Sequence, residues 1–592
     1  MSVERWLWVV RFGALLAVVA CGGGSDADDS GAPDAMADAS VADAGDAAAL
    51  DGATGDAGAD ASADSGTDSG TDSSMPLPRR NEGSPLGTNL SGIRDWVPSW
   101  PFVDVFKTSR GWISGSSSEW DDGRPVDVDA EGWVRSLAAG QVARALMLWS
   151  STHFPEGQYI VLYDGVGTLE YRQGASRDDA ASAPGRDVVD FASSAGGFLM
   201  NLSSTDASDP LRNIRVIMPG GVCSDDALSY CDASSPCGTG TCESFEDVYA
   251  TQVFHPQFLS RVARYRLLRF MDWMDTNGSE QSVWADRPKP SDARWSTHGV
   301  PVELMVELSN RLSADAWINI PHLADDDYVT QLASYLRDNL RPDLRVYIEY
   351  SNEVWNGQFA QAGYAREQGL AASLSTNDFQ AQLFYQSQRS VEIFQIFEGV
   401  FGATDRLVRV MAAQAANDWT STQVLEFGAA GAHTDALAIA PYFGSSLGGP
   451  SERARVSAMG VDELMTELST NTLPTSIGWI RDQAAVASAH GVALIAYEGG
   501  QHLVGNRGVE NDATINALFD AANADPRMGD LYTTYLNAWR SEGGQVFAHF
   551  THVAEPGKYG RWGSLEYEDQ ARSEAPKFDA LMNFIDANPA WW

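Results

Sequence analysis

Apolar and polar residues alternate in two rhythms along residues 253–592. Short runs rich in β-branched and aromatic residues, such as 344–353 and 492–500, are typical of buried strands. Between them lie longer segments, such as 255–265 and 325–340, in which apolar residues recur every three to four positions as in amphipathic helices. Apolar strands that alternate with helices indicate a parallel sheet covered by helices on both faces.

The number of strands points to one architecture for this part of the chain. With a strand at 87–90 included, the pattern contains eight strands with helices between them. Eight such units over roughly 400 residues predict an α/β fold of the (β/α)₈ TIM barrel type, and a doubly wound open sheet is the alternative. No G-x-G-x-x-G loop follows a predicted strand, so nothing indicates a dinucleotide, and no cofactor is expected.

Residues 119–221 differ from the barrel pattern because they contain short strands and little helical periodicity. Two β-branched and aromatic runs flank Asp164 and Gly165, which is typical of a β-hairpin. Another short apolar run follows at 197–204. We predict that this region is a β-sandwich inserted after the first barrel strand, which lies with an aromatic loop in 77–118.

The first residues of the chain have the composition of an export signal. Residues 1–20 combine Arg5 and Arg11 with a short apolar run that ends in small residues, as in a secretory signal peptide. Cys21 follows directly and resembles the cysteine of a bacterial lipobox, which implies cleavage before Cys21 and lipidation of its thiol. The alternative is an ordinary signal peptide with an incidental cysteine. The lipoprotein interpretation predicts an exported protein anchored to a bacterial membrane or cell surface only through this lipid.

Residues 21–76 are predicted to be a disordered linker of mostly Asp, Ala, Gly and Ser. From residue 25 to residue 75 there are 13 Asp and no Lys, Arg or aromatic residue, so this tract carries −13 of the formal net charge of −40. Such a segment has too little apolar surface to offset the entropy of folding. The rest of the chain is also acidic and has no basic stripe, which argues against nucleic acid and fits a neutral poly- or oligosaccharide.

Four cysteines, Cys223, Cys231, Cys237 and Cys242, lie in a predicted loop at 222–252. An even number of cysteines in a loop-like segment of an exported chain predicts two disulfides. Of the three connectivities we expect the sequential one, Cys223 with Cys231 and Cys237 with Cys242. A four-cysteine zinc site is the rival, although its usual C-x₂₋₄-C pairs differ from the seven, five and four intervening residues here. Either arrangement would cross-link the segment.

In a (β/α)₈ barrel the functional residues gather at the carboxyl ends of the strands. Glycoside hydrolysis requires two carboxyl groups there, one to protonate the leaving oxygen and one to attack the anomeric carbon or activate a water. Glu353 and Glu498 end two different predicted strands, and the amide of Asn352 is suited to hold a sugar hydroxyl beside them. The full set of polar or aromatic residues at strand ends is Arg269, Asp272, Trp273, His322, Asn352, Glu353, Gln414, Tyr442, Glu498, His549 and His552.

The sequences around the two glutamates carry a family resemblance. "YSNEVWN" resembles the Asn-Glu end of the fourth barrel strand in clan A glycoside hydrolases, which include the family 5 cellulases and mannanases. "IAYEGG" resembles the seventh-strand end that carries the nucleophile of that clan. The resemblance implies a retaining double displacement with Glu353 as general acid/base and Glu498 as nucleophile. It also matches Arg269 on the second strand and Tyr442 on the sixth to clan positions near the nucleophile.

The resemblance covers residues 255–592 together with the first strand. The Asn-Glu-Pro motif common in the better-known families is replaced here by Asn352-Glu353-Val354-Trp355. The family within the clan and the substrate therefore stay open.

Aromatic side chains near the strand ends are expected to stack on the apolar faces of sugar rings. We predict subsite walls at Trp273, Trp355 and Trp562, of which Trp562 resembles the eighth-strand tryptophan of the clan. His322 is predicted either to bind a sugar hydroxyl or to cap the Asp-rich segment that follows it.

The glutamate at position 349 needs a separate interpretation. Tyr347, Glu349, Ser351 and Glu353 share one face of a strand with a period of two. Glu349 lies four residues deeper than Glu353, where a carboxylate needs a partner, and Arg269 is the candidate. His549 and His552 are interpreted as structural. No two histidines are spaced for a metal on one helix face, so no catalytic metal is expected.

The main prediction is a monomeric retaining glycoside hydrolase that cleaves β-linked glycosides or polysaccharides such as cellulose, β-glucan or mannan. A retaining site predicts carboxyl groups about 5–5.5 Å apart. The first alternative is a non-catalytic carbohydrate-binding surface lipoprotein of the same fold. The second is an adhesion or scaffold protein in which the sandwich binds and the barrel is inert.

Overall fold

The computed structural model describes residues 80–149 and 151–592. The predicted signal peptide at 1–20, the lipidation site Cys21 and the linker at 21–76 lie outside the described residues. Among the described helices, none combines the length and the apolar character that crossing a membrane requires.

Eight parallel strands close into a barrel, which confirms the predicted α/β fold. Each strand pairs with its neighbour, and the last pairs with the first, so the barrel has no unpaired edge. The fourth and seventh strands of the barrel precede Glu353 and Glu498, in agreement with the order expected from the sequence. In their order around the barrel the strands are β1 (Leu86–Asn89), β15 (Leu267–Arg269), β16 (Asp315–Ile320), β17 (Val346–Tyr350), β18 (Leu407–Ala412), β19 (Ala436–Ile439), β20 (Ala493–Ala496) and β21 (Gly544–His549).

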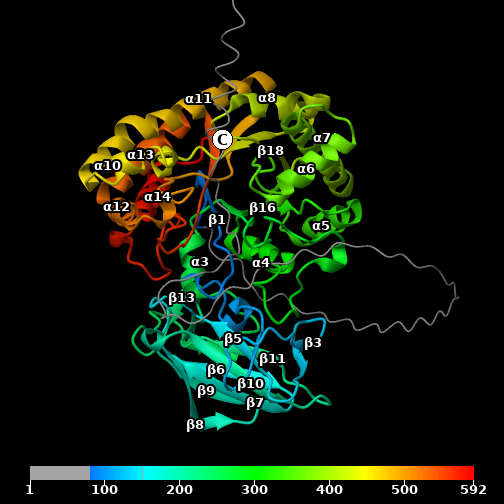
Figure 1. Ribbon diagram of the computed structural model, residues 1–592, viewed down its shortest axis with the longest axis vertical. Coiled ribbons are helices and arrows are strands. Elements are labelled where there is room, and N and C mark those ends of the chain that lie inside the picture. The colour runs from blue at the N-terminus through cyan, green and yellow to red at the C-terminus, as the bar shows by residue number, and fades with distance from the viewer. Residues whose placement is uncertain (1–79, 150) are drawn as a thin grey trace, which may run out of the picture. The chain divides into compact units, whose positions relative to one another are not determined.

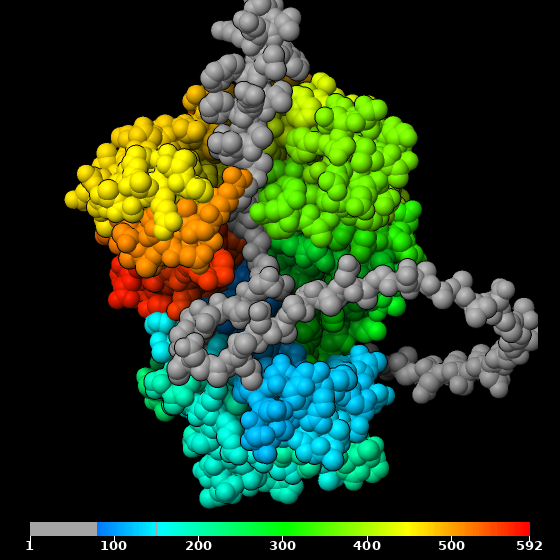
Figure 2. Space-filling view, viewed as in Figure 1, coloured from blue at the N-terminus to red at the C-terminus, as the bar shows by residue number. Residues whose placement is uncertain are grey.

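Helices follow the barrel strands and cover their outer side (Figure 1). In the space-filling view these helices form much of the visible surface of the barrel, from green to red (Figure 2). They are α3 (Pro256–Val262), α4 (Val302–Leu312), α5 (Asp326–Asn339), α6 (Ala360–Ala371), α7 (Asp378–Phe401), α8 (Asp418–Glu426), α9 (Arg453–Val456), α10 (Val461–Glu467), α11 (Leu473–His490), α12 (Ala513–Ala524), α13 (Pro526–Ser541) and α14 (Pro576–Ala587).

The strand side chains divide into two buried sets on opposite faces of the barrel wall. Leu268, Ile318 and Ile348 belong to the large apolar core that also includes the surrounding helices. Trp317 and Tyr347, their neighbours in sequence, belong to a second cluster, in which the two rings stack at 5.4 Å. Because adjacent residues of a strand point to opposite faces, this second cluster fills the interior of the barrel.

Between β1 and β15 the chain forms a β-sandwich. Its two four-stranded antiparallel sheets have the strand orders β2-β5-β10-β7 and β11-β6-β9-β8. Met147 and Phe198 of the first sheet and Val161 and Val189 of the second share one apolar core, as expected for two sheets packed face to face. The sandwich strands are β2 (Ile113–Gly115), β5 (Val142–Met147), β6 (Gly157–Asp164), β7 (Gly167–Gln173), β8 (Ala175–Ala183), β9 (Arg186–Phe191), β10 (Phe198–Thr205) and β11 (Arg212–Ile217), and the hairpin β3 (Asp127–Val128) with β4 (Val134–Ser136) lies between β2 and β5 in the chain.

The cysteine-rich segment, predicted as a loop, contains a small three-stranded sheet. Its middle strand is β12 (Gly221–Cys223), and β13 (Asp226–Cys231) and β14 (Cys242–Ser244) pair with it on either side. Both pairings are antiparallel.

The four cysteines form two disulfides as predicted, but the expected sequential pairing is wrong. Cys223 bonds Cys237, and Cys231 bonds Cys242. The strand register explains the second bond, because Cys231 lies opposite Gly221 of the middle strand. A side-chain carbon at Gly221 would lie 3.1 Å from the Cys242 Sγ, so glycine leaves room for a disulfide that joins the two outer strands. The sulfurs are bonded to each other, which rules out the rival zinc site.

Peptide mapping tests this connectivity. Digestion without reduction should release one peptide pair joined through Cys223 and Cys237 and another joined through Cys231 and Cys242. The double variant Cys231→Ser/Cys242→Ser should lower the stability of this sheet by about 2–4 kcal/mol, because the unfolded segment gains freedom when the cross-link is lost. Recovery of Cys223 joined to Cys231 would contradict the observed strand register.

Candidate active site

Glu353 reaches the site through a strained turn after the fourth barrel strand. Strand β17 ends at Tyr350, and Ser351 and Glu353 both have positive φ, 55° and 44°. A left-handed conformation costs a residue with a side chain about 1–2 kcal/mol, so tertiary contacts must hold it. The Ser351 N–H donates to the Ile320 carbonyl (2.8 Å), and the Asn356 N–H donates to the Glu353 carbonyl (2.8 Å). The predicted strand face shared by positions 347, 349, 351 and 353 is therefore wrong beyond Tyr350.

The carboxyl group of Glu353 is held by two neutral donors. The Tyr497 hydroxyl donates to Oε1 (2.8 Å), and the Asn356 amide donates to Oε2 (2.9 Å). The residue is only 1% exposed. Burial raises the pKa of this carboxyl to about 7, against the smaller opposing effects of Asn356, Tyr497 and Arg269. A carboxyl with this pKa can carry a proton near neutral pH.

Glu498 directly follows Tyr497 at the end of the seventh strand and contacts a cation. The Arg269 guanidinium donates from Nη1 to Oε1 (2.9 Å), and the Tyr442 hydroxyl donates to Oε2 (2.9 Å). Burial raises the pKa of Glu498 to about 8, and the charge of Arg269 and the hydrogen bond from Tyr442 act against this rise. The residue is 0% exposed.

The ionisation of each carboxyl group disfavours the ionisation of the other. The charge of Glu353 raises the pKa of Glu498, so both carboxyls are not readily ionised together. Only Glu498 has a guanidinium 2.9 Å away, whereas the hydrogen-bond donors to Glu353 are neutral. We therefore place the proton on Glu353 and the negative charge on Glu498. This is the division of roles that a general acid and a nucleophile need.

Arg269 of β15 connects its own strand with three others in the barrel interior. Besides Glu498 it contacts Glu349, with 2.9 Å from Nη2 to Oε2, which confirms the predicted partner of Glu349. It also donates to the side-chain oxygens of Asn89 (3.0 Å) and Asn352 (2.9 Å). Arg269 is fully buried, so the two carboxylates supply the charge compensation that a buried guanidinium needs.

Asn352 directly precedes Glu353 and contacts Arg269, but its amide is largely occupied. Its oxygen accepts from Arg269, and its nitrogen donates to Asn277 Oδ1 (3.1 Å). Gln361 of α6 supports this arrangement by donating to the Asn352 carbonyl (2.8 Å). These contacts make Asn352 a holder of Arg269, and its role as a clamp for a sugar hydroxyl stays a prediction.

Of the three predicted tryptophan walls, the structure brings Trp562 to the site. Its ring lies 5.6 Å from that of Tyr442 and 4.8 Å from that of His502, and it is only partly buried. The prediction for Trp273 is wrong: the side chain is 1% exposed, donates to the Ser91 carbonyl (3.1 Å) and belongs to the apolar core. Trp355 is partly buried and packs against that same core, so its role as a subsite wall stays a prediction.

The remaining strand-end residues have mostly structural surroundings. His552 Nε2 lies 3.0 Å from Glu568 Oε1, and His549 Nε2 lies 3.3 Å from the Tyr532 hydroxyl, in agreement with structural roles. His322 is 7% exposed, its Nδ1 is buried without a hydrogen-bond partner, and burial lowers its pKa. Gln414 accepts from Gln483 through its backbone carbonyl.

Sequence reasoning missed four residues that shape the site. Tyr497 and Asn356 bind Glu353, Asn89 binds Arg269, and His502 packs against Tyr442 at 5.5 Å. Three of them lie within four residues of Glu353 or Glu498. Polar residues that flank a candidate carboxylate were the signal that would have found them.

Within the described residues, one group of His, Cys, Asp or Glu side chains has distances suited to a metal ion. It consists of Cys223, Cys231 and Cys237. All three sulfurs are in disulfides, so they do not hold a metal in this state.

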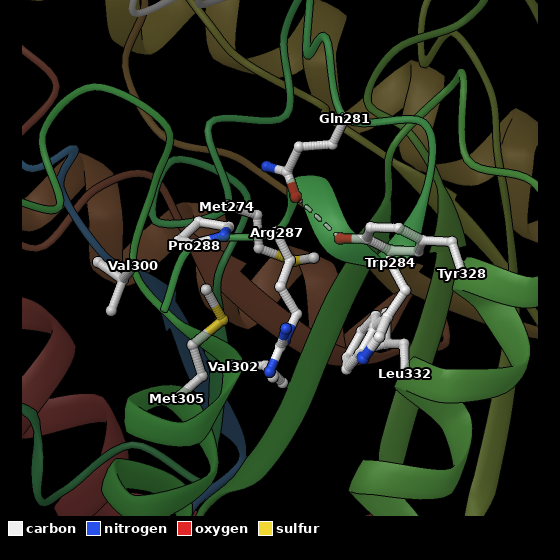
Figure 3. A pocket seen from close by; sticks show the side chains of 10 residues that line it. All are labelled: Met274, Gln281, Trp284, Arg287, Pro288, Val300, Val302, Met305, Tyr328 and Leu332. Carbon is white, nitrogen blue, oxygen red and sulfur yellow. Dashed lines mark hydrogen bonds between the residues drawn. The ribbon is translucent and has the colours of Figure 1, made fainter. Parts of the chain in front are cut away.

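A small cavity lies beside the barrel, where the chain after β15 meets α4 and α5 (Figure 3). Tyr328 donates to Gln281 across it (2.9 Å), and Arg287 stacks on the Trp284 ring at 4.4 Å. Its volume of about 20 Å³ accommodates about one water molecule. It is too small for a sugar.

No family model and no curated protein matches this chain. Among solved structures, it is 12% identical to a GH51 arabinofuranosidase from Xanthomonas axonopodis pv. citri, over 62% of this chain and 70% of that one, with a TM-score of 0.35. It is 12% identical to a Bacteroidetes-affiliated GH5 cellulase, over 56% of this chain and 88% of that one, with a TM-score of 0.33.

A third similar structure is the endo-1,4-β-D-mannanase from Thermotoga petrophila, at 10% identity over 56% of this chain and 94% of that one, with a TM-score of 0.31. These proteins are glycoside hydrolases, and the eight-stranded barrel is the fold that the resemblance to clan A implied. Such distant likenesses leave the chemistry to be argued from the side chains.

Replacing Glu353 by Gln should remove a pH-dependent loss of stability. Burial raises the folded-state pKa of Glu353 from 4.5 to about 7, so its stabilising contribution is complete below pH 4.5 and is lost as the pH rises to about 7. Relative to wild type, the free energy of unfolding of Glu353→Gln should therefore increase by about 3 kcal/mol between pH 4.5 and pH 8. Urea denaturation at both pH values measures this difference.

Glu498→Gln tests the other member of the pair. Burial and the charge of Glu353 raise the pKa of Glu498 to about 8, so the stability difference of this variant from wild type should also grow between pH 4.5 and pH 8. A Glu353→Gln variant whose stability runs parallel to wild type at all pH values would contradict the placement of the proton on Glu353.

Proposed function

We propose that the chain is a retaining glycoside hydrolase that cleaves β-linked glycosides or polysaccharides of the cellulose, β-glucan or mannan type. The observation that carries this proposal is the unequal pair of carboxyl groups at the ends of the fourth and seventh barrel strands. Neutral donors hold Glu353, and a guanidinium and a tyrosine hydroxyl hold Glu498. Double displacement requires one protonated and one ionised carboxyl group in such a pair.

In the first step, a carboxylate oxygen of Glu498 attacks the anomeric carbon. The bond to the leaving oxygen breaks as Glu353 transfers its proton to that oxygen, and a glycosyl ester of Glu498 forms. The contacts from Arg269 and Tyr442 fix the orientation of the attacking carboxylate before the reaction.

In the second step, Glu353 acts as the base. Formation of the ester removes the charge of Glu498, and this loss lowers the pKa of Glu353, because each carboxylate disfavours ionisation of the other. The ionised Glu353 then accepts a proton from a water that attacks the anomeric carbon, and Glu498 leaves. Two inversions restore the β configuration.

The N-terminal segment adds a proposal about location. Cleavage before Cys21 and lipidation of its thiol would anchor the protein at the surface of a bacterial cell. The acidic linker at 21–76 would then hold a monomeric enzyme away from the membrane, where it can reach polysaccharide.

Carbohydrate binding without turnover is a second candidate function. The observation that favours it is the burial of both glutamates, which are 1% and 0% exposed. A substrate must displace neighbouring side chains before either carboxyl group can act on it.

Azide rescue separates the roles of the two glutamates. Glu498→Ala should lower kcat for aryl β-glycosides by at least about 10³-fold, because no covalent intermediate forms. Azide bound in the vacated space should attack from the same face and give an α-glycosyl azide. In Glu353→Ala, azide should instead attack the glycosyl ester and give a β-glycosyl azide, which NMR distinguishes from the α product.

Glu392→Gln is the control, since this partly exposed glutamate of α7 pairs with Arg389 and Gln388 and contacts neither Glu353 nor Glu498 within the described residues. It should keep wild-type kcat. Unchanged activity in Glu498→Ala would contradict the mechanism. A wild-type protein that binds cellohexaose or mannohexaose and hydrolyses neither would favour the second candidate function.

Tyr497→Phe should move the basic limb of the kcat/KM profile to higher pH. The Tyr497 hydroxyl stabilises the ionised form of Glu353 and so lowers its pKa against the effect of burial. Without this hydrogen bond the acid form persists to a pH about 0.5–1 unit higher. Tyr442→Phe, which removes the corresponding bond to Glu498, should raise the acidic limb instead. Coincident profiles for wild type and Tyr497→Phe would show that Glu353 does not set the basic limb.

A further inference from the structure

Asp272 lies at the mouth of the barrel, three residues after Arg269. A tight turn at the end of β15 holds it, in which the Asp275 N–H donates to the Asp272 carbonyl (3.2 Å). Its Cβ lies 3.8 Å from the position that a side-chain carbon would take at Gly92, in the chain after β1. Asp272 thus lies where the connection after the second barrel strand meets the connection after the first.

The carboxylate of Asp272 has no protein partner. Among the hydrogen bonds and ion pairs of residues 80–149 and 151–592, none involves its side-chain oxygens, although the residue is partly buried. Burial raises the pKa of Asp272 to about 6, against the attraction of Arg94 and Arg269. The neighbouring acid differs: Asp275 pairs with Arg94 at 2.9 Å.

Buried acids elsewhere in the chain show what a structural role requires. Glu568 accepts from His552 (3.0 Å), from the Ser99 hydroxyl (2.9 Å) and from the Trp100 N–H (3.1 Å). Glu349 is paired with Arg269. Asp272 differs from both because it is only partly buried, so water reaches its carboxylate, and the hydroxyl groups of a ligand can take the place of that water as donors.

Asp272 belongs to the same mouth as the proposed nucleophile. It follows Arg269, which contacts Glu498 at 2.9 Å, by three residues, and the charge of Asp272 raises the pKa of Glu498. The adjacent Met271 packs with Tyr442 and Phe550, and the Trp562 ring lies against this cluster. Asp272 therefore lies in a loop whose preceding residues, Arg269 and Met271, contact Glu498 and pack with Tyr442.

We propose that Asp272 contacts the substrate, accepts hydrogen bonds from hydroxyl groups of the sugar bound beside Glu498, and selects neutral sugars over uronic acids. This inference rests on the proposed function. A carboxylate can only accept hydrogen bonds when ionised, and hydroxyl groups supply the donors. A uronate would meet Asp272 and Glu498 with a charge of the same sign, and Arg269 is already paired with two carboxylates.

Kinetics with neutral and acidic substrates test the proposal. Asp272→Ala should lower kcat/KM for a neutral aryl β-glycoside about 10- to 100-fold, because a charged hydrogen bond to the substrate is lost. Asp275→Asn, three residues away and already paired, should stay within about twofold of wild type. Asp272→Asn should reduce the preference for the neutral glycoside over the matching aryl β-uronoside, because the repulsion is removed.

A set of monodeoxy aryl glycosides identifies the contact. One deoxy position should weaken turnover by wild type about 10-fold or more and leave Asp272→Ala unaffected, since the variant has already lost the bond. The dissociation constant of cellohexaose or mannohexaose, measured by tryptophan fluorescence in a Glu498→Gln background, gives a second readout. Asp272→Ala should weaken this binding about 10-fold as well.

The outcomes separate this inference from the proposed function. Hydrolysis by wild type with equal kinetics for Asp272→Ala and Asp275→Asn would overturn the role of Asp272 and leave the glycosidase intact. Oligosaccharide binding that depends on Asp272, without hydrolysis of any glycoside, would support Asp272 as a sugar contact and overturn the glycosidase. A protein that neither binds nor hydrolyses these sugars would overturn both.

Discussion

The buried guanidinium of Arg269 is the interaction on which the rest of the site depends. A cation in the interior of a barrel is tolerated only where anionic partners surround it, and here Glu349 and Glu498 both lie 2.9 Å away. These contacts join the second, fourth and seventh strands, so barrel closure and charge pairing support each other. Glu349 partly neutralises the cation from deeper in the barrel, and the contact with Arg269 favours the ionised form of Glu498 at the mouth.

The same cation decides how the proton is distributed. Burial raises the pKa of both glutamates, and the negative charge is favoured where the guanidinium makes contact. Glu353 has neutral donors only, which leaves it as the acid. Tyr497 joins the two halves of the site, because its hydroxyl binds Glu353 and its ring lies 5.1 Å from the Arg269 guanidinium. Adjacent residues of one strand end, Tyr497 and Glu498, thus position both carboxyl groups.

Periodicity predicted the barrel, the order of its strands and the pairing of Glu349 with Arg269, because each follows from burial on alternating faces. It could not predict the positive φ of Glu353, since hydrogen bonds from other parts of the chain hold that turn. The disulfide pairing likewise depends on the register of three strands and on the small size of Gly221. Trp273 follows a strand as the pattern requires, yet packs into the apolar core that the barrel shares with its helices.

The central claim is that two unequal carboxyl groups cleave a β-glycoside by double displacement. NMR of the sugar released at the start of hydrolysis, before mutarotation, tests this claim most directly. The mechanism has two inversions at the anomeric carbon and therefore predicts that the β anomer appears first. Initial release of the α anomer would mean a single displacement by water, and it would contradict the assignment of Glu498 as nucleophile.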